Sequence, residues 1–182
     1  MLRLENNNQI TCITNSPQQA EFVAASGLEV IEHDLACGLP ETIAARHFNV
    51  TLLLESYSHI TNREALLVQA HSVSSRLVMR VNCTRSQHPE DFLAFGGTMR
   101  MPTPAQLMLD VREAGWKPLM IRDVRMKTLQ TIKDWHSRLG EIEIPATADN
   151  LLTLQGLCLY ALRDLKKWGK SAPLIELVAD KL

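Results

Sequence analysis

Apolar residues in the first half of the chain alternate between short β-branched runs and stretches with helical spacing. The run QITCIT at 9–14 predicts a strand. The helix after it is expected to begin with Ser16 as N-cap and Pro17 at its first position, and to end at Gly27. LEVIEHDL predicts a second strand. The run VTLLL at 50–54 is apolar at nearly every position, which is typical of a strand covered on both faces.

The same alternation continues to the C-terminus. TNREALLVQAHSVS and TPAQLMLDVREAGW predict helices, and SRLVMRVN and KPLMIRDV predict the strands that follow them. Two amphipathic helices, MKTLQTIKDWHSRLG and TADNLLTLQGLCLYALRDLKKWG, precede a last strand in APLIELVAD. Residues 86–104, with Gly96, Gly97 and three prolines, predict a loop placed to cover a site, and residues 126–169 predict a helical cap.

This order of elements predicts an α/β fold in a single domain over residues 1–182. Strands that alternate with helices favour a parallel sheet with right-handed crossovers and helices on both faces. A ligand is then expected beyond the carboxyl ends of the strands.

Composition narrows the functional classes. The chain has 182 residues, a formal charge of -1 and 46% hydrophobic residues, which is typical of a globular domain and gives a nucleic-acid partner no global electrostatic support. No run reaches the length of a membrane span, and the N-terminal segment resembles neither a signal peptide nor an anchor. We therefore expect neither a nucleic-acid partner nor a membrane.

Cysteine and histidine spacing indicates no metal site. Cys12, Cys37, Cys83 and Cys158 are scattered without a CxxC pair and lie in apolar runs, so reduced, buried thiols and a cytoplasmic location are expected. The histidines show no metal-ligand spacing with cysteines or carboxylates.

Four stretches in this order carry a resemblance to a known family: ITCITNSPQQ, EHDLACGLP, FNVTLLLESYSHI and EAGWKPLMIRDVRMKTLQTIKDWHSRL. Over nearly its whole length the chain resembles class I S-adenosylmethionine (SAM)-dependent methyltransferases, in particular the branch that methylates small molecules. The resemblance implies a Rossmann-like sheet, SAM as cofactor and a small-molecule substrate.

The resemblance also suggests site residues. Thr14 matches the position whose acidic residue usually bonds the ribose hydroxyls of the cofactor, and Asp34 matches the aspartate that holds its adenine amino group. Glu55 follows the family's fourth strand and would face cofactor or substrate, while His59 would act as a general base. Local roles remain open: Asp34 also suits a turn, Glu55 can satisfy nearby backbone, and His59 suits a solvated loop.

The family's first strand and the glycine-rich loop that receives the cofactor have no counterpart before Gln9. In the family this strand lies at the centre of the sheet, so the resemblance implies a Rossmann-like methyltransferase sheet lacking its first strand and glycine-rich loop. The strands beside the gap could close on each other, meet a docked partner, or accept a strand from another polypeptide. An incomplete chain is a further explanation of the missing strand.

Three functions follow from this interpretation. The first is a degenerate accessory subunit, inactive alone, that assembles with a complete SAM-dependent methyltransferase, or with a similar chain as a homo-oligomer, and acts as scaffold or activator. The second is a split enzyme that receives its glycine loop, and with it SAM, from a partner chain. The third is a small-molecule binding module that no longer uses SAM.

Overall fold

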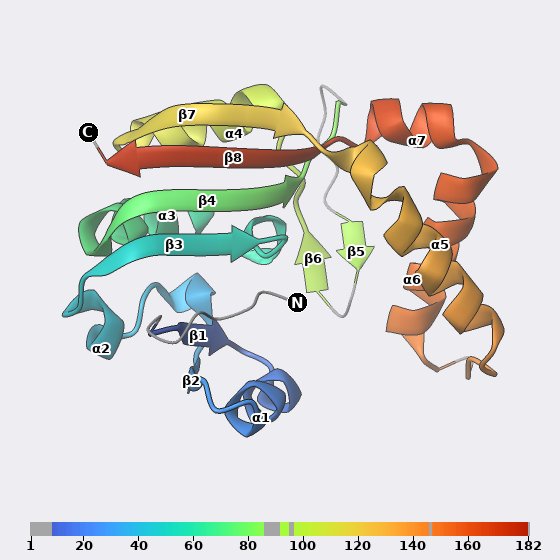
Figure 1. The fold of residues 1–182 in the computed structure, drawn as a ribbon, viewed down its shortest axis with the longest axis horizontal. Helices are drawn as coiled ribbons and strands as arrows, with labels where there is room; N and C mark the ends of the chain where they lie inside the picture. Colours follow the sequence, from blue (N-terminus) through green and yellow to red (C-terminus); the bar gives the residue numbers. More distant parts are fainter. Residues whose placement is uncertain (1–8, 86–91, 95–96, 146, 182) are drawn as a thin grey trace.

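The computed structural model describes residues 9–85, 92–94, 97–145 and 147–181 (Figure 1). Its largest sheet has four strands, in the spatial order β3 (Phe48–Leu54), β4 (Ser74–Asn82), β8 (Leu174–Lys181) and β7 (Trp116–Asp123). Strand β3 pairs parallel with β4, whereas β8 runs antiparallel to both β4 and β7. The expected α/β fold is confirmed, but the expectation of an all-parallel sheet is wrong at β8.

A separate two-stranded parallel sheet lies beside β3. It consists of β1 (Thr11–Thr14) and β2 (Glu29–Glu32), connected by helix α1 (Pro17–Ala25). Ser16 caps this helix by accepting a hydrogen bond from the Gln19 backbone, as the sequence predicts. In the part of the chain that the structure describes, β1 and β3 do not pair, so the two edges have not closed on each other.

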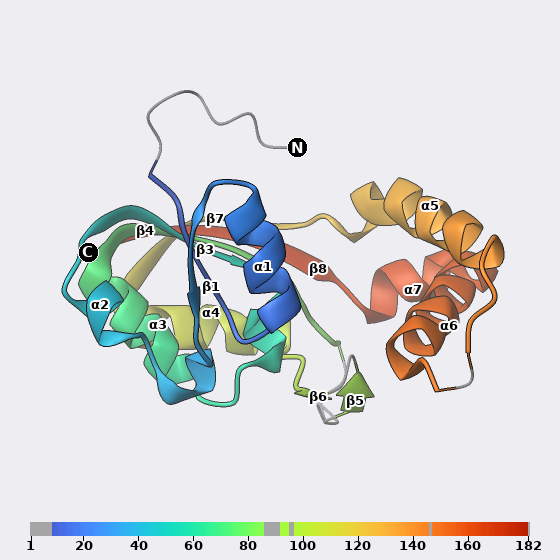
Figure 2. The same cartoon turned by 90° about the horizontal axis from the view of Figure 1, so that it is seen from below.

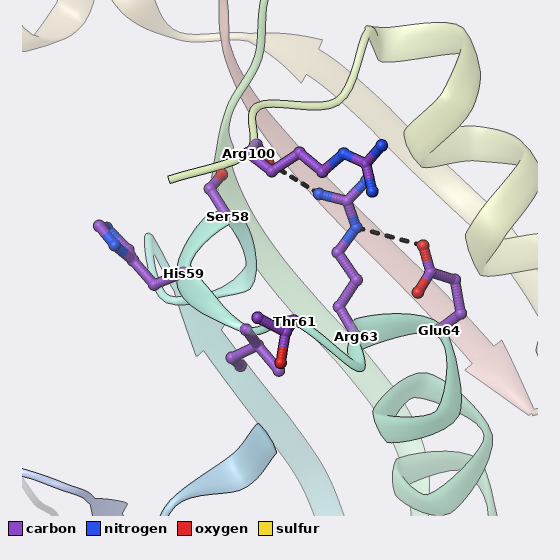
Figure 3. A pocket seen from close by; sticks show the side chains of 7 residues that line it. Ser58, His59, Thr61, Arg63, Glu64 and Arg100 are labelled. Carbon is purple, nitrogen blue, oxygen red and sulfur yellow. Dashed lines mark hydrogen bonds and ion pairs between the residues drawn. The ribbon is translucent and has the colours of Figure 1, made fainter. Parts of the chain in front are cut away.

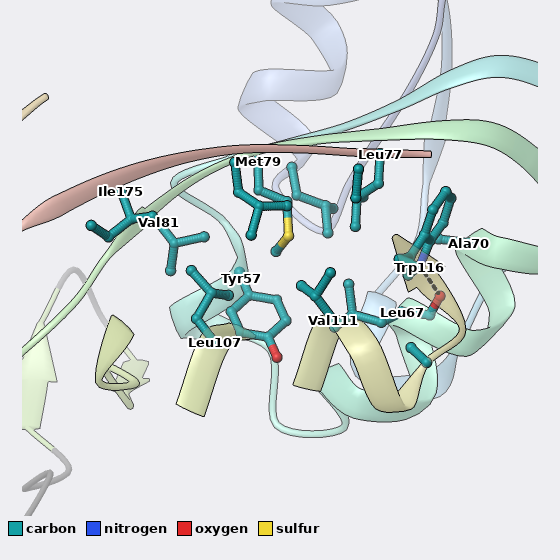
Figure 4. Packing of buried hydrophobic residues seen from close by; sticks show 14 of the residues in the cluster. Tyr57, Leu67, Ala70, Leu77, Met79, Val81, Leu107, Val111, Trp116 and Ile175 are labelled. Atoms are coloured by element: carbon teal, nitrogen blue, oxygen red, sulfur yellow. Dashed lines mark hydrogen bonds between the residues drawn. The ribbon is translucent and has the colours of Figure 1, made fainter. Parts of the chain in front are cut away.

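Helices cover one face of the four-stranded sheet (Figure 2). They are α3 (Arg63–Val73), α4 (Pro104–Glu113) and the short α2 (Glu41–Ala44). The sheet meets them through every second residue of β4, namely Leu77, Met79 and Val81, all fully buried (Figure 4). Each fully buried aliphatic side chain of this kind stabilises the fold by about 1.5–3 kcal/mol. The main core therefore lies on the helical side of the sheet.

The opposite face of the four-stranded sheet is open near β3. Leu53 points into the core and is 5% exposed, whereas its neighbours Leu52 and Leu54 are 51% and 54% exposed. The expectation that the apolar run 50–54 is covered on both faces is therefore wrong for the described residues.

A second group of helices lies beyond the carboxyl ends of β3, β4 and β7 (Figure 1). It contains α5 (Leu129–Gly140), α6 (Asp149–Arg163) and α7 (Leu165–Ser171), entered through the turn η3 (Arg125–Thr128). These helices share a small core of their own, formed by Ile132, Leu139, Cys158, Ala161 and Trp168. The single long helix expected before the last strand is broken at Asp164, whose carboxylate caps α7 by accepting from the Lys167 backbone at 2.9 Å.

Part of the expected loop at 86–104 is a hairpin. Strands β5 (Phe92–Ala94) and β6 (Gly97–Met99) pair antiparallel, while residues 86–91 and 95–96 lie outside the described residues. After the hairpin, the Arg100 backbone donates to the Ser58 carbonyl at 2.8 Å, in the turn η2 (Tyr57–His59). The hairpin therefore adjoins the end of β3. The remaining turn is η1 (Leu35–Cys37).

Two further properties bear on the expected location and chemistry. None of the described helices combines the length and the apolar character that crossing a membrane requires. All four cysteines are free, but only Cys83 and Cys158 are buried; Cys37 is exposed, against the expectation of a buried thiol.

Candidate functional site

The candidate site lies where β3, β4 and β7 end, next to the helices α5, α6 and α7, which we call the cap. Open α/β sheets bind ligands at this edge. Glu55, the first residue after β3, has a φ of 61°, in the left-handed region that non-glycine residues rarely occupy. Its backbone N–H donates to the Arg80 carbonyl at 2.6 Å, which fixes this conformation. Backbone strain of this kind costs about 1–3 kcal/mol and concentrates at functional sites.

A chain of hydrogen bonds leads from Glu55 to the cap. The Asn82 amide donates to a Glu55 carboxylate oxygen at 3.1 Å and accepts from Arg125 Nη2 at 2.5 Å. Arg125 Nε donates to the Ala172 carbonyl at 2.5 Å, just after α7. The buried guanidinium of Arg125 therefore connects the Glu55 carboxylate, through Asn82, to the cap.

Burial shifts the pKa values of two groups at this edge of the sheet, Arg125 and Cys83. Burial lowers the pKa of the Arg125 guanidinium, and the negative charges of Glu55 and Asp123 partly oppose that shift. Burial also raises the pKa of the Cys83 thiol to about 12, with Arg125 acting in the opposite direction. Cys83 is therefore protonated at neutral pH and unsuited to nucleophilic chemistry.

His59 lies on η2, four residues after Glu55, and borders a small cavity (Figure 3). The cavity of about 120 Å³ is lined by Ser58, His59, Ile60, Thr61, Arg63, Glu64 and Arg100. It is smaller than the roughly 300–1,000 Å³ of ordinary ligand pockets, so it can receive a functional group and not a whole cofactor. The His59 ring points away from Arg63 and Glu64, so it does not join their ion pair (Figure 3).

Beneath His59, buried polar contacts hold η2 in place. Arg63 donates to the Arg100 carbonyl at 2.7 Å, and its guanidinium lies 5.1 Å from the centre of the Tyr57 ring. The Tyr57 hydroxyl donates to Asp110 at 2.9 Å. Burial, and then the negative charge of Asp110, raise the pKa of Tyr57, so this hydroxyl remains a donor. The turn that carries His59 is therefore rigidly supported.

The other two predicted site residues lie across the gap and make local contacts. The Thr14 hydroxyl donates to the Gln19 side chain at 2.7 Å. Asp34 caps η1 by accepting from the Ala36 backbone at 2.9 Å, which is the turn role that the sequence left open. The His33 backbone donates to the Thr14 carbonyl at 2.8 Å, so these two strand ends are adjacent. The four predicted residues thus form two pairs, one on each side of the gap.

Sequence reasoning missed Asn82 and Arg125. Each is a polar residue at or just after the carboxyl end of a strand, Asn82 in β4 and Arg125 two residues after β7. The rule that ligands lie beyond strand ends could have found both. Among the described residues, no three His, Cys, Asp or Glu side chains are grouped to hold a metal ion.

Comparison by sequence finds no matching family model and no matching curated protein. Comparison of the fold finds many similar solved structures. The cyclase SpnF superposes with a TM-score of 0.72 at 21% identity, covering 95% of this chain and 66% of its own. Coclaurine N-methyltransferase, bound to N-methylheliamine and SAH, superposes with a TM-score of 0.71 at 17% identity, covering 94% and 60%.

A cyclopropane synthase from Mycobacterium tuberculosis, MmaA2, gives a TM-score of 0.70 at 13% identity, covering 94% of this chain and 69% of its own. This chain therefore spans about two thirds or less of the first two of these proteins. At such identities the likeness establishes the fold alone. The described residues have the Rossmann-like fold of class I SAM-dependent methyltransferases.

Proposed function

We propose that this chain is a methyltransferase-like subunit that assembles with a complete SAM-dependent methyltransferase of small-molecule metabolism and acts as its scaffold or activator. The observation that carries the proposal is the interruption between β1 and β3. Both strands are parallel to their partners on one side and have no ladder partner among the described residues on the other.

The free edge of β3 is suited to accept a strand. The Glu55 N–H bonds to β4, and ladder groups alternate in direction along a parallel strand. The backbone groups of Val50, Leu52 and Leu54 are therefore directed to the gap. Unpaired edges of this kind are hazards that proteins cover, and strand addition satisfies them through main-chain hydrogen bonds.

Local hydrogen bonding on the far side of the gap supports an accessory role. Thr14 and Asp34, which the resemblance places at the ribose and the adenine, bond to Gln19 and to the turn backbone. The fold does not by itself imply methyl transfer, since a similar structure carries the name of a cyclase. We therefore assign the scaffold or activator role to this chain and SAM binding to its partner.

A split enzyme is the second candidate, and one observation favours it. Glu55 is held in a strained conformation with His59 on the next turn, at the edge where the reacting groups of a completed sheet would meet. In that assembly a bound SAM supplies an electrophilic methyl group. His59 would take the proton that the methyl acceptor loses, and Glu55 would orient the acceptor or the imidazole ring of His59.

The deciding experiment is to purify the tagged chain gently from its native cells and to identify stoichiometric partners by mass spectrometry. SAM is then titrated by calorimetry into the chain alone, the partner alone and the complex. A full-length methyltransferase that binds SAM alone and gains activity in the complex supports the accessory subunit. SAM binding only after mixing supports the split enzyme, and a monomer that binds no methyltransferase contradicts both.

A further inference from the structure

The open face of the four-stranded sheet carries an ordered pattern of side chains. The strand register aligns Leu52 with Val78, Val78 with Val178, and Val178 with Met120. Residues that are aligned in register point to the same side of a sheet. An apolar row therefore crosses all four strands, on the face opposite to α3 and α4.

On β4, β8 and β7 a row of charges lies on each side of this apolar row, whereas on β3 the flanking positions are Val50 and Leu54. On one side Arg76 pairs with Asp180 at 2.6 Å, and Lys117 is aligned with the same aspartate. On the other side Glu176 pairs with Arg80 at 2.7 Å and with Arg122 at 2.6 Å.

In these two rows the cations Arg76, Lys117, Arg80 and Arg122 exceed the carboxylates Asp180 and Glu176, and both carboxylates are already bound by arginines. Hydrogen bonds from Arg80 and Arg122 lower the pKa of Glu176, and a hydrogen bond from Arg76 lowers the pKa of Asp180. Both carboxylates are therefore ionised at neutral pH, and the face keeps a surplus of positive charge along both margins of its apolar row.

We propose that this face is the docking surface for an amphipathic helix of another polypeptide, with an apolar stripe that packs on Leu52, Val78 and Val178 and acidic residues on both sides of it. The apolar stripe of a helix matches the width of one apolar row, and carboxylates on its flanks would meet the surplus cations. A helix with basic flanks would meet like charge instead.

The position of the face agrees with a strand inserted in the gap. Right-handed crossovers that leave a sheet in opposite directions place their helices on opposite faces. The connection from β3 to β4 places α3 on the helical face. A helix that follows an inserted strand and turns toward β1 therefore arrives on the open face, over the gap, whereas the docked helix follows the apolar row across β4 and β8 and is a different segment of the same polypeptide. The proposal rests on the proposed function for the identity of the polypeptide that carries this helix.

The test uses two synthetic helical peptides of about five turns with the same leucine stripe, one with glutamate on both flanks and one with lysine. Their binding to the purified chain is measured by fluorescence anisotropy. The glutamate peptide is expected to bind and the lysine peptide to fail. Raising the salt from about 0.05 M to about 0.5 M should weaken binding, because these charges are exposed.

Substitutions on β7 test the strand of this sheet that lies farthest from the gap. The double variant Lys117→Gln with Arg122→Gln should lower the affinity of the chain for the glutamate peptide by about tenfold or more. The double variant Arg112→Gln with Arg138→Gln removes the same charge from exposed positions on α4 and α5 and should leave binding unchanged.

Several outcomes overturn the docking surface: equal binding of the two peptides, binding of neither, or equal weakening by the two double variants. Self-association of the chain that the β7 variant abolishes assigns the face to a second copy, and also overturns it. A chain that selects the glutamate peptide but recruits no methyltransferase keeps the docking surface and contradicts the proposed function. Recruitment of a methyltransferase without peptide selectivity contradicts the docking surface alone.

Discussion

The guanidinium of Arg125 lies 5.0 Å from the centre of the Trp168 ring. Arg125 follows the end of β7 and Trp168 lies on α7, so this stacking contact joins the sheet to the cap. The same guanidinium reaches Asn82 and the Ala172 carbonyl. One buried side chain therefore connects the strand ends, the site carboxylate of Glu55 and the helical cap.

Arg125→Ala is expected to loosen the cap. The substitution leaves Asn82 and the Ala172 carbonyl without their donor and removes the stacking contact, so the free energy of unfolding should fall by about 2–4 kcal/mol. Urea unfolding measures the loss, and limited proteolysis should cut within residues 129–171 first. Arg138→Ala, at an exposed position on α5, should change the stability by less than about 0.5 kcal/mol. Equal effects of the two substitutions would contradict the role assigned to Arg125.

The strained backbone of Glu55 predicts that glycine is more stabilising than alanine at this position, the reverse of the usual order. Glu55→Gly and Glu55→Ala both remove the carboxylate that Asn82 contacts, but only glycine adopts a φ of 61° without steric cost. Glu55→Gly should therefore be more stable than Glu55→Ala by about 1 kcal/mol in urea unfolding. At Glu32 in strand β2, where glycine only weakens the strand, the order should reverse. Alanine and glycine variants of equal stability at position 55 would show that the backbone there is unstrained.

Glu176 predicts part of the acid sensitivity. Hydrogen bonds from Arg80 and Arg122 hold its pKa below the ordinary value of 4.5. The folded state therefore binds this proton less readily than the unfolded state does. The resulting stability is present above pH 4.5 and is lost as the pH falls through the lower pKa of the folded protein.

Glu176→Gln should flatten the fall of unfolding free energy below about pH 4.5, measured by urea unfolding at a series of pH values. Glu21→Gln, an exposed position on α1, supplies the matched control and should keep the slope of the parent protein. If Glu176→Gln leaves the slope of unfolding free energy against pH unchanged, the contacts of Glu176 with Arg80 and Arg122 do not cause the acid sensitivity.

Local patterns predicted most elements, and long-range arrangement explains what they missed. Ser16, Pro17 and Gly27 marked the bounds of α1 through capping chemistry that needs no tertiary context. The apolar run 50–54 could not reveal its uncovered face, because a run of this kind states which residues are apolar and not what packs on them. The antiparallel β8 was missed for the same reason, since strand direction depends on pairing partners far away in the sequence.

The site divides in a similar way. Glu55 and His59 were found because they directly follow a strong strand. Arg125 was missed because its partners Asn82, Trp168 and Ala172 lie far from it along the chain and meet it only once the cap has folded back on the sheet. Asp34 fits the turn role that its sequence context already offered.

The same polar substitution should have a large effect on stability on the buried side of β3 and a small effect on its open side. Leu53 is buried against the helices, so Leu53→Thr should lower the free energy of unfolding by about 2–4 kcal/mol through lost packing and a buried hydroxyl. Leu52 is 51% exposed on the open face, so Leu52→Thr should change the stability by less than about 1 kcal/mol. Because it removes part of the proposed docking surface, Leu52→Thr should also weaken binding of the glutamate peptide, measured by fluorescence anisotropy. Val68→Thr, at a 54% exposed position on α3, is the control and should leave peptide binding unchanged. If Leu52→Thr instead unfolds the chain as Leu53→Thr does, the face is covered and the gap beside β3 is closed in solution.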